Sequence, residues 1–179
     1  ETAPFGRLSS GEEVTLYRLR SGNGASMEVI DYGCRVVRIC VPDRNGVIAD
    51  IVPGYDDIRD FETGSERFFG ALIGRYGNRI AGGRFALGGT TYDVGCNESG
   101  RGHLHGGETG FDKYIWDAEI LSDHGEPSVR FSLVSADGDM GYPGRLTVSV
   151  IFTVRDENAL ELAYRAVSDK DTVLNLTNH

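Results

Sequence analysis

Two stretches in the last third of the chain alternate between apolar and polar residues, and this alternation limits the possible folds more than any other feature. Residues 146–154 and 160–166 place an apolar side chain at every second position. These positions are Leu146, Val148, Val150, Phe152, Val154, Leu160, Leu162, Tyr164 and Ala166. A period of two is typical of a β-strand with one face on a core. The Asp-Glu-Asn segment at 156–158 between them predicts a hairpin turn.

Strand-like patterns extend over the rest of the chain, whereas helical periodicity is almost absent. The other predicted strands are residues 14–19, 27–32, 35–41, 68–76, 90–94 and 114–121. Only residues 56–66, in which Ile58 and Phe61 are three positions apart, favour one or two helical turns. The 25 glycines among 179 residues follow no Gly-X-Y period and therefore indicate turns rather than collagen. We predict an all-β fold in one domain, either an antiparallel sandwich or a barrel.

The charge balance argues against two classes of partner. The chain has 18 Lys and Arg residues against 27 Asp and Glu residues, a formal net charge of −9. A nucleic-acid-binding protein or one that binds an anionic membrane surface needs a basic patch, and the basic residues here do not cluster. The longest apolar stretch, residues 146–154, is far shorter than the roughly 18 residues of a transmembrane helix. We expect neither nucleic acid nor membrane as a partner.

The cysteines and the first residue bear on the cellular compartment. The three cysteines are odd in number and form no CxxC pair, and Cys34 and Cys40 alternate with apolar neighbours. Buried free thiols are therefore favoured over a disulfide. The sequence begins at Glu1 rather than Met, which favours a periplasmic or secreted protein over a cytoplasmic one.

A first polar cluster occupies residues 74–83, Gly-Arg-Tyr-Gly-Asn-Arg-Ile-Ala-Gly-Gly. Arg79 offers forked N–H donors and Asn78 adds an amide, a combination that suits a hydroxylated or anionic ligand. The same pattern also fits a solvent-exposed turn, and these residues alone leave both readings open.

A second cluster contains His103 and His105 in a Gly-His-Leu-His-Gly-Gly segment. Two histidines at i and i+2 of a strand share one face, as metal ligands do. Glu108 follows His105 by three residues, close to the carboxylate spacing of jelly-roll metal sites. Metal binding, acid–base chemistry and a structural histidine remain equally open for this pair. His124, in contrast, is expected in a surface loop.

A third cluster ends the sequence. Residues 172–179 alternate as a strand, with Asn175, Thr177 and His179 on one face. The imidazole is the side chain whose ordinary pKa suits proton transfer near neutral pH. Because the strand pattern stops at His179 without a turn, we expect residues 1–179 to be the N-terminal portion of a single domain.

The three clusters together resemble the aldose 1-epimerase, or galactose mutarotase, family. The resemblance rests on several motifs that follow one another in the family's order and span nearly the whole chain. These are residues 41–46, 51–55, 74–85, 104–107, 110–113, 116, 137–144 and 175–179. The family implies a large antiparallel β-sandwich with a sugar cleft on one sheet. It also implies interconversion of the α and β anomers of free hexoses such as galactose and glucose, without metal or cofactor.

The resemblance assigns roles to four residues. His179 is implied as the general acid that protonates the ring oxygen, and His105 as a hydrogen-bond partner of the sugar near the reacting centre. Asn78 and Arg79 are implied to bind sugar hydroxyls. His103 stands where the family commonly has serine, so no role follows for it.

The resemblance also implies residues that lie beyond this sequence. The family's general base is a glutamate in the C-terminal half, and no Glu here falls in a matching motif. We therefore expect the C-terminal half as a partner, either missing from this sequence or present as a second chain. Two alternatives stay open: a sugar-binding homologue without catalysis, and a metal-dependent jelly-roll enzyme that uses His103 and His105.

Overall fold

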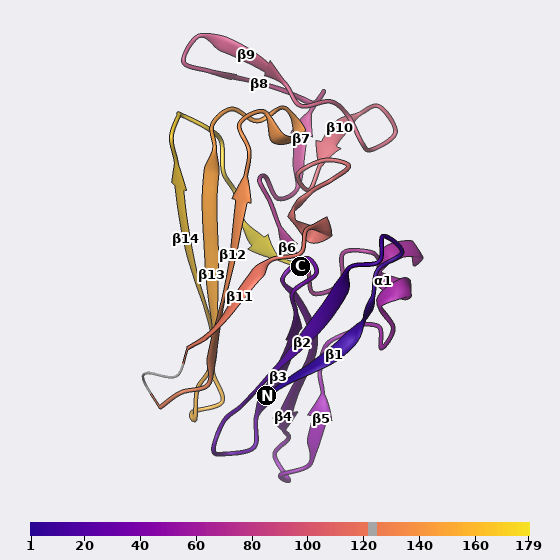
Figure 1. Ribbon diagram of the computed structural model, residues 1–179, viewed down its shortest axis with the longest axis vertical. Coiled ribbons are helices and arrows are strands. Elements are labelled where there is room, and N and C mark those ends of the chain that lie inside the picture. Colours follow the sequence, from indigo (N-terminus) through magenta and orange to yellow (C-terminus); the bar gives the residue numbers. More distant parts are fainter. Residues whose placement is uncertain (122–124) are drawn as a thin grey trace.

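The computed structural model describes residues 1–121 and 125–179, so the loop expected around His124 lies outside the described residues. The first sheet contains five antiparallel strands in sequence order (Figure 1). They are β1 (Thr2–Arg7), β2 (Glu13–Arg20), β3 (Ser26–Ile30), β4 (Arg35–Pro42) and β5 (Ile48–Asp50). This meander agrees with the strands predicted over 14–19, 27–32 and 35–41, and adds β1 and β5.

The second sheet contains four longer antiparallel strands. They are β11 (Asp117–Leu121), β12 (Ser128–Ser135), β13 (Leu146–Val154) and β14 (Leu160–Ser168). The predicted strand at 146–154 is confirmed residue for residue, and all five of its alternating apolar side chains are at most 1% exposed. The turn predicted between β13 and β14 is also present, since the Arg155 amide donates to the Ala159 carbonyl at 2.9 Å.

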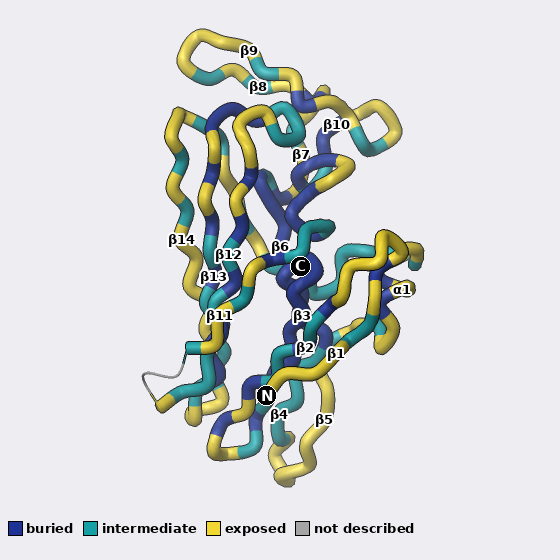
Figure 2. Tube along the Cα trace, in the orientation of Figure 1, coloured by how far each residue is buried: buried dark blue, intermediate teal, exposed yellow. Residues whose placement is uncertain are grey.

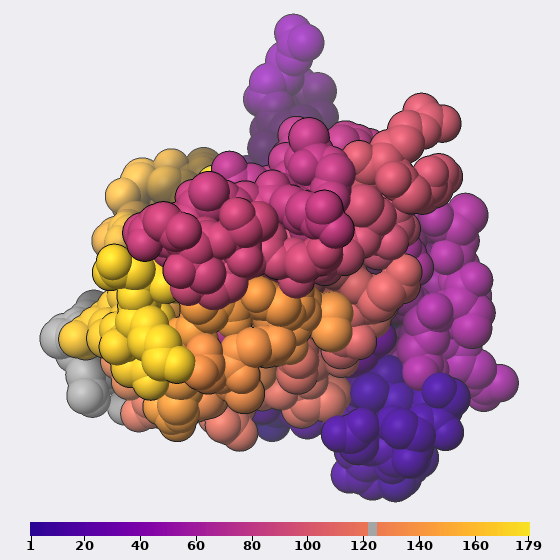
Figure 3. All heavy atoms as spheres, turned by 90° about the horizontal axis from the view of Figure 1, so that it is seen from above, coloured from indigo at the N-terminus to yellow at the C-terminus, as the bar shows by residue number. Residues whose placement is uncertain are grey.

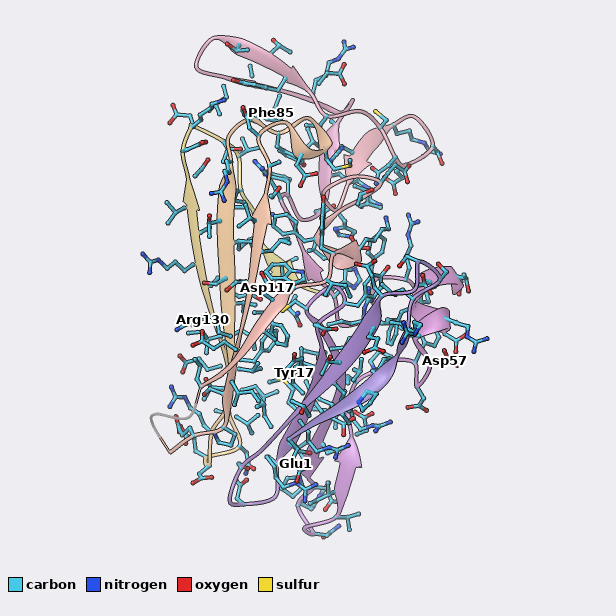
Figure 4. The ribbon with its side chains drawn as sticks, viewed as in Figure 1. Glu1, Tyr17, Asp57, Phe85, Asp117 and Arg130 are labelled. Carbon is cyan, nitrogen blue, oxygen red and sulfur yellow. The ribbon has the colours of Figure 1, made fainter. Side chains whose placement is uncertain are left out.

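The two sheets pack face to face and form a sandwich, which is the predicted fold class. Apolar side chains of β2 and β3 meet those of β12 and β13 in one buried cluster. Tyr17 extends from β2 toward the second sheet and meets the Phe131 ring edge-on, with centroids 5.3 Å apart (Figure 4). Buried positions alternate along β12 with positions that are intermediate or, at Val134, exposed (Figure 2), as expected for a strand with one face on a core.

The opposite face of the first sheet has its own smaller core. The short helix α1 (Ile58–Thr63) covers it with the buried side chains of Ile58 and Phe61. Asp57 caps this helix, because its carboxylate accepts the Arg59 amide at 2.9 Å. The helical turns predicted within 56–66 are therefore confirmed.

Three two-stranded pairs lie beyond the main sheets and carry the polar clusters. They are β6 (Leu72–Ile73) with β15 (Thr177–Asn178), β7 (Arg79–Ala81) with β10 (Gly102–Leu104), and β8 (Arg84–Leu87) with β9 (Thr90–Asp93). Seen from above, the β8–β9 hairpin lies against the connection between β12 and β13 (Figure 3), where Phe85 stacks on Tyr142 at 6.0 Å. Two single-turn 3-10 helices, η1 (Phe111–Lys113) and η2 (Asp139–Gly141), complete the connections.

Two strand predictions were wrong in length. Residues 68–76 form only the two-residue β6, and residues 172–179 form only the two-residue β15. In both segments the backbone hydrogen bonds go to scattered partners instead of one continuous ladder. β12, which carries Val129, Phe131 and Leu133 at alternate positions, was not predicted although its pattern is regular.

All three cysteines are free, as expected for Cys34 and Cys40. Only Cys34 is fully buried, because Cys40 lies on β4 near the edge of the first sheet and is half-buried. Among the described residues no helix combines the length and the apolar character that a membrane crossing requires.

Candidate functional site

Two histidines distant in sequence come together with a phenylalanine. His105 follows β10, His179 follows β15, and Phe68 precedes β6. The centroids of the two imidazoles are 5.2 Å apart, and their planes are nearly perpendicular. The Phe68 ring contacts both, with centroid distances of 4.9 Å to His105 and 5.8 Å to His179. The structure thus brings together the two histidines to which the sequence assigned chemistry.

His105 is fixed by a reciprocal pair of hydrogen bonds with Asn78. The His105 amide donates to the Asn78 carbonyl at 3.0 Å, and the Asn78 amide donates to His105 Nδ1 at 3.0 Å. Because a backbone N–H can only donate, Nδ1 must be unprotonated. The proton of the neutral ring is therefore on Nε2. Both residues have a left-handed backbone, with φ of 52° at His105 and 66° at Asn78, which histidine and asparagine adopt more readily than most residues.

The surroundings of His105 favour its neutral form. Partial burial lowers the pKa of His105 below its ordinary value, and the nearby positive charges of His179 and Arg79 lower it further. Glu98 acts weakly in the opposite direction. A neutral His105 with its proton on Nε2 is a hydrogen-bond donor. If His105 and His179 were both charged, their rings, with centroids 5.2 Å apart, would repel each other.

Asn78 and Arg79 lie beside the histidines at the start of β7. Arg79 pairs with Leu104 across the β7–β10 ladder, which places it next to His105. The Arg79 guanidinium binds the Glu98 carboxylate at two points, Nε to Oε2 at 2.6 Å and Nη2 to Oε1 at 2.5 Å. The third group, Nη1, donates to Asn78 Oδ1 at 3.2 Å. Hydrogen bonding to Arg79 lowers the pKa of Glu98, so this carboxylate is charged at neutral pH.

A cavity of about 430 Å³ adjoins this ion pair. Its lining consists of Arg79, Ala81, Glu98, Ser99, Arg101 and Gly102. Arg79, Arg101, Ser99 and Glu98 contribute N–H donors, a hydroxyl and a carboxylate to this lining. Such groups suit a small polar ligand better than an apolar one.

Close backbone packing around Gly74 and Gly106 holds together the segments that carry the site. A Cβ atom at Gly106 would lie 1.8 Å from the Gly74 carbonyl oxygen, and one at Gly74 would lie 2.2 Å from the Phe111 ring. The segments that carry His105 and Asn78 can therefore approach each other only because both positions are glycine. Arg75 is buried and donates to Ser135, Ala136 and Pro143 of the second sheet and its following loop. This anchors the segment to the sandwich.

The segment that carries Phe68 is held by a second buried arginine. Arg35 Nη1 donates to the carbonyls of Arg67 and Phe69, at 2.8 and 2.7 Å. These carbonyls flank Phe68 on both sides. The guanidinium itself lies over the Phe61 ring, 4.6 Å from its centroid. Arg35 thus fixes the backbone from which the Phe68 ring extends toward the histidines.

The position of His179 is set by its main chain. Its amide donates to the Ala71 carbonyl at 2.8 Å, and its carbonyl accepts the Gly70 amide at 2.7 Å. Asn175 donates to the Gly77 carbonyl through its side chain and so joins this segment to the one that carries Asn78. Of the predicted polar face, only His179 joins the ring cluster, while Asn175 serves as a tether.

The structure does not bring His103 and His105 into a common metal site. His103 is buried on β10, where its Nδ1 lies 3.2 Å from the Gly95 carbonyl and its ring meets Tyr142 edge-on. The left-handed backbone at His105 ends the strand alternation and turns its ring into different surroundings. Within residues 1–121 and 125–179, no three His, Cys, Asp or Glu side chains are grouped closely enough for a metal ion.

Two site residues, Phe68 and Glu98, were missed from sequence. Phe68 lies in a segment predicted as an ordinary strand, and Glu98 lies in a loop of small polar residues. The pairing of Leu104 with Arg79 brings Glu98 within reach of the guanidinium, and this register cannot be read from local spacing. No local signal identified Glu98, which lies 19 positions after Arg79 in the sequence.

Fold and site together define a β-sandwich protein with a polar, histidine-containing site on the short strand pairs beyond the main sheets. The family model described as aldose 1-epimerase matches residues 15–179. The chain belongs to the aldose 1-epimerase family.

Curated relatives agree with this assignment. The chain is 41% identical to the galactose mutarotase of Mus musculus over 176 residues, which cover 98% of this chain and 49% of that protein. It is 39% identical to the Homo sapiens galactose mutarotase, over 99% of this chain and 50% of that protein. It is 38% identical to an aldose 1-epimerase of Haemophilus influenzae, over 94% of this chain and 47% of that protein. The chain spans about half the length of these relatives.

Solved structures show the same relation. A galactose 1-epimerase from Lactobacillus acidophilus superposes with a TM-score of 0.86 at 25% identity, over 100% of this chain and 51% of that one. An aldose epimerase homologue from C. elegans superposes with a TM-score of 0.81 at 31% identity, over 92% of this chain and 49% of that one. The sandwich therefore matches one half of each of these proteins.

Proposed function

We propose that this chain provides the acid and sugar-binding side of an aldose 1-epimerase site, which interconverts the α and β anomers of free hexoses such as galactose and glucose. The observation that carries the proposal is the meeting of His105 and His179, with ring centroids 5.2 Å apart, beside Asn78. These residues come from three separate segments. The names and identities of the relatives support the same activity.

The two histidines take different roles in this proposal. His179, which is exposed and whose backbone is fixed by two main-chain hydrogen bonds, is the general acid that protonates the ring oxygen of the sugar. His105 has a lowered pKa and its proton on Nε2, so it donates a hydrogen bond near the reacting centre without becoming charged. The difference in their surroundings supports this division of labour.

Asn78 and Arg79 bind the sugar hydroxyls. The Asn78 amide oxygen faces Arg79, so its NH₂ group faces away from the guanidinium. Arg79 keeps one N–H on each Nη atom after its bonds to Glu98 and Asn78. These donors suit the lone pairs of hydroxyl oxygens.

The reaction is a transfer of protons. A base removes the proton of the anomeric hydroxyl, the C1–O5 bond breaks, and the ring oxygen takes a proton from the acid. This leaves an open-chain aldehyde, which rotates about the C1–C2 bond and closes to the other anomer, returning both protons. Nothing is oxidised or reduced, so the step calls for no redox cofactor. We assign no base within this chain and propose that a glutamate outside residues 1–179 supplies it.

The partner of this chain is proposed to be the sequence that corresponds to the other half of its relatives, on the same or a second polypeptide. Edge strand β14 supports this proposal, because its inner-face residues Leu160, Leu162 and Tyr164 are only partly covered by the present chain. We therefore expect purified residues 1–179 alone to fold poorly and to lack activity. Anomerisation of α-D-galactose by this polypeptide at the rate of a full-length relative, measured by polarimetry, would disprove the expectation.

The decisive experiment is His179→Asn in a protein that includes the second half. Asparagine can hydrogen-bond but cannot donate a proton as an acid, so we expect the anomerisation rate to fall by about 10²–10⁴-fold. Polarimetry with α-D-galactose and α-D-glucose measures the rate, and circular dichroism checks the fold. An unchanged rate would remove His179 from the mechanism. Galactose binding without any rate above that of buffer would favour a non-catalytic sugar-binding protein instead.

A further inference from the structure

The contacts of Arg79 assign a function to Glu98 that the proposed reaction does not itself require. Glu98 pairs with Gly102, the first residue of β10, in an isolated β-bridge, and its carboxylate binds the Arg79 guanidinium. We propose that Glu98 is a positioning residue for sugar recognition: it clamps Arg79 and thereby orients both Arg79 and Asn78 toward the sugar hydroxyls. This inference rests on the proposed function.

The clamp fixes the guanidinium plane at two points. Nε and Nη2 of Arg79 bind the two oxygens of Glu98 at 2.6 and 2.5 Å, a bidentate arrangement that allows one orientation of the fork. The Arg79 side chain is 55% exposed and, without the clamp, would be free to sample many rotamers. Holding it in place before the sugar arrives reduces the entropy lost on binding.

The clamp extends to Asn78 through the third arm of the guanidinium. Nη1 donates to Asn78 Oδ1 at 3.2 Å, and arginine has no acceptor, so the amide oxygen must face Arg79. The Asn78 NH₂ group is then directed away from Arg79. Arg79 and Asn78 therefore both offer N–H donors to a ligand, which suits hydroxyl oxygens that accept.

The ion pair between Arg79 and Glu98 contributes too little to folding stability for stability to be its main role. Both partners are partly exposed, Arg79 at 55% and Glu98 at 32%, and such pairs contribute only about 0–1 kcal/mol to folding. Loss of Glu98 should therefore leave the fold intact. A matched control exists on the second sheet, where Glu119 pairs with Arg130 at 2.8 Å between β11 and β12. In the common view of Figures 1 and 4, Arg130 lies on the second sheet, below the position of β7 and β10.

The test compares Glu98→Gln with Glu119→Gln in the catalytically active protein. Glutamine keeps the size of the side chain but replaces one acceptor oxygen with an NH₂ group, so the two-point clamp is lost. We expect Glu98→Gln to raise the KM for α-D-galactose about tenfold with kcat changed less than about twofold. Glu98→Asp, which keeps the carboxylate, should recover part of that loss, and Glu119→Gln should leave KM unchanged. Equal melting temperatures of the two Gln variants would show that the effect is not structural.

A second measurement separates this inference from the proposed function. The Arg79 Nε–H signal in a nitrogen-15 NMR spectrum should be protected from exchange in the parent protein and lose that protection in Glu98→Gln. An unprotected parent signal, or an unchanged KM in an active Glu98→Gln variant, would overturn the positioning role. If the parent protein is inactive while Arg79 is protected, the proposed function fails instead. The same tenfold loss is then sought in galactose binding by calorimetry, and its absence there overturns the inference as well.

Discussion

The sandwich core and the histidine site are built from different kinds of contact. In β12 and β13 the chain alternates regularly, and Phe131, Val150 and Phe152 are fully buried. Around the histidines the strands are two or three residues long, and backbone groups are satisfied by scattered partners. The core relies on apolar area and a continuous ladder, whereas the site relies on individual polar bonds and on close backbone contacts.

This difference shows how the two regions depend on each other. The site segment at Arg75 follows the buried residues Leu72 and Ile73, and it is anchored further by four hydrogen bonds from one buried guanidinium to the end of β12 and the loop after it. The buried arginines, Arg35 and Arg75, thus attach the loops around the site to the packed sheets. Mutations in a protein that includes the second half should separate the two contributions.

The largest expected effect is the loss of a core ring. Phe152 is fully buried on β13 and packs edge-on against Phe131, with centroids 5.9 Å apart. Phe152→Ala should lower the free energy of unfolding by about 3–5 kcal/mol, because it removes apolar burial and leaves a cavity. Urea denaturation measures this. Ile120→Ala is the control, since Ile120 on the same sheet is 59% exposed and its loss should cost little.

The next effect tests the close packing beneath the site. Gly106→Ala should cost about 3 kcal/mol, because φ is +86° and the added methyl group would lie 1.8 Å from the Gly74 oxygen. Gly89 has a comparable φ of +80°, but an added Cβ there would meet nothing within 4 Å. Gly89→Ala should therefore lower the free energy of unfolding only through backbone strain, by about 1–2 kcal/mol. Equal losses in urea denaturation would mean that the close approach of Gly106 to Gly74 is unimportant. A larger loss at Gly106 accompanied by a lower anomerisation rate would link the packing to the site.

The contrast between the regions also explains what could be predicted from the sequence. β13 was predicted residue for residue because an apolar residue stands at every second position of its sequence, and each of these side chains is buried. The site residues His105, His179, Asn78 and Arg79 were identified from motifs, and the structure brings them into one region. Their roles remain predictions that the experiments above address.

The errors have a common physical cause. The segments at 68–76 and 172–179 alternate like strands, yet their length as strands is limited by tertiary contacts that local patterns do not encode. Phe68 and Glu98 were missed for the same reason, because Arg35 and the β7–β10 register position them. Metal binding by His103 and His105, one of three alternatives that the sequence left open, is not supported, because the left-handed backbone at His105 breaks the alternation that would place both rings on one face.

A smaller effect separates two adjacent phenylalanines. Phe68 and Phe69 are both half-buried, but Phe68 contacts the histidines and Phe69 packs against Tyr55 in the smaller core, with centroids 5.9 Å apart. Phe68→Ala should lower kcat/KM by about tenfold, or about 1.4 kcal/mol, with a smaller effect on stability. Phe69→Ala should do the reverse and lower stability with little effect on kcat/KM. Polarimetry and urea denaturation on both variants test this, and the same pattern in both would reject Phe68 as part of the site.

The smallest effect concerns the protonation of His105. Its pKa should lie below the ordinary value of about 6.5, because burial and the charges of His179 and Arg79 disfavour the imidazolium. The unfolded chain therefore binds a proton at His105 more readily than the folded chain. The contribution of His105 to folding stability should be complete above pH 6.5 and should decline as the pH falls below it.

An NMR titration of the His105 ring measures this pKa directly. His179→Asn removes the second of its causes, so the pKa of His105 should rise in that variant while burial still keeps it below the ordinary value. His105→Gln should reduce the acid sensitivity of the free energy of unfolding between pH 7 and pH 5. A His105 pKa at or above the ordinary value would contradict the neutral donor role. If the pKa of His105 is low but does not change in His179→Asn, burial and the charge of Arg79 lower it without a contribution from His179.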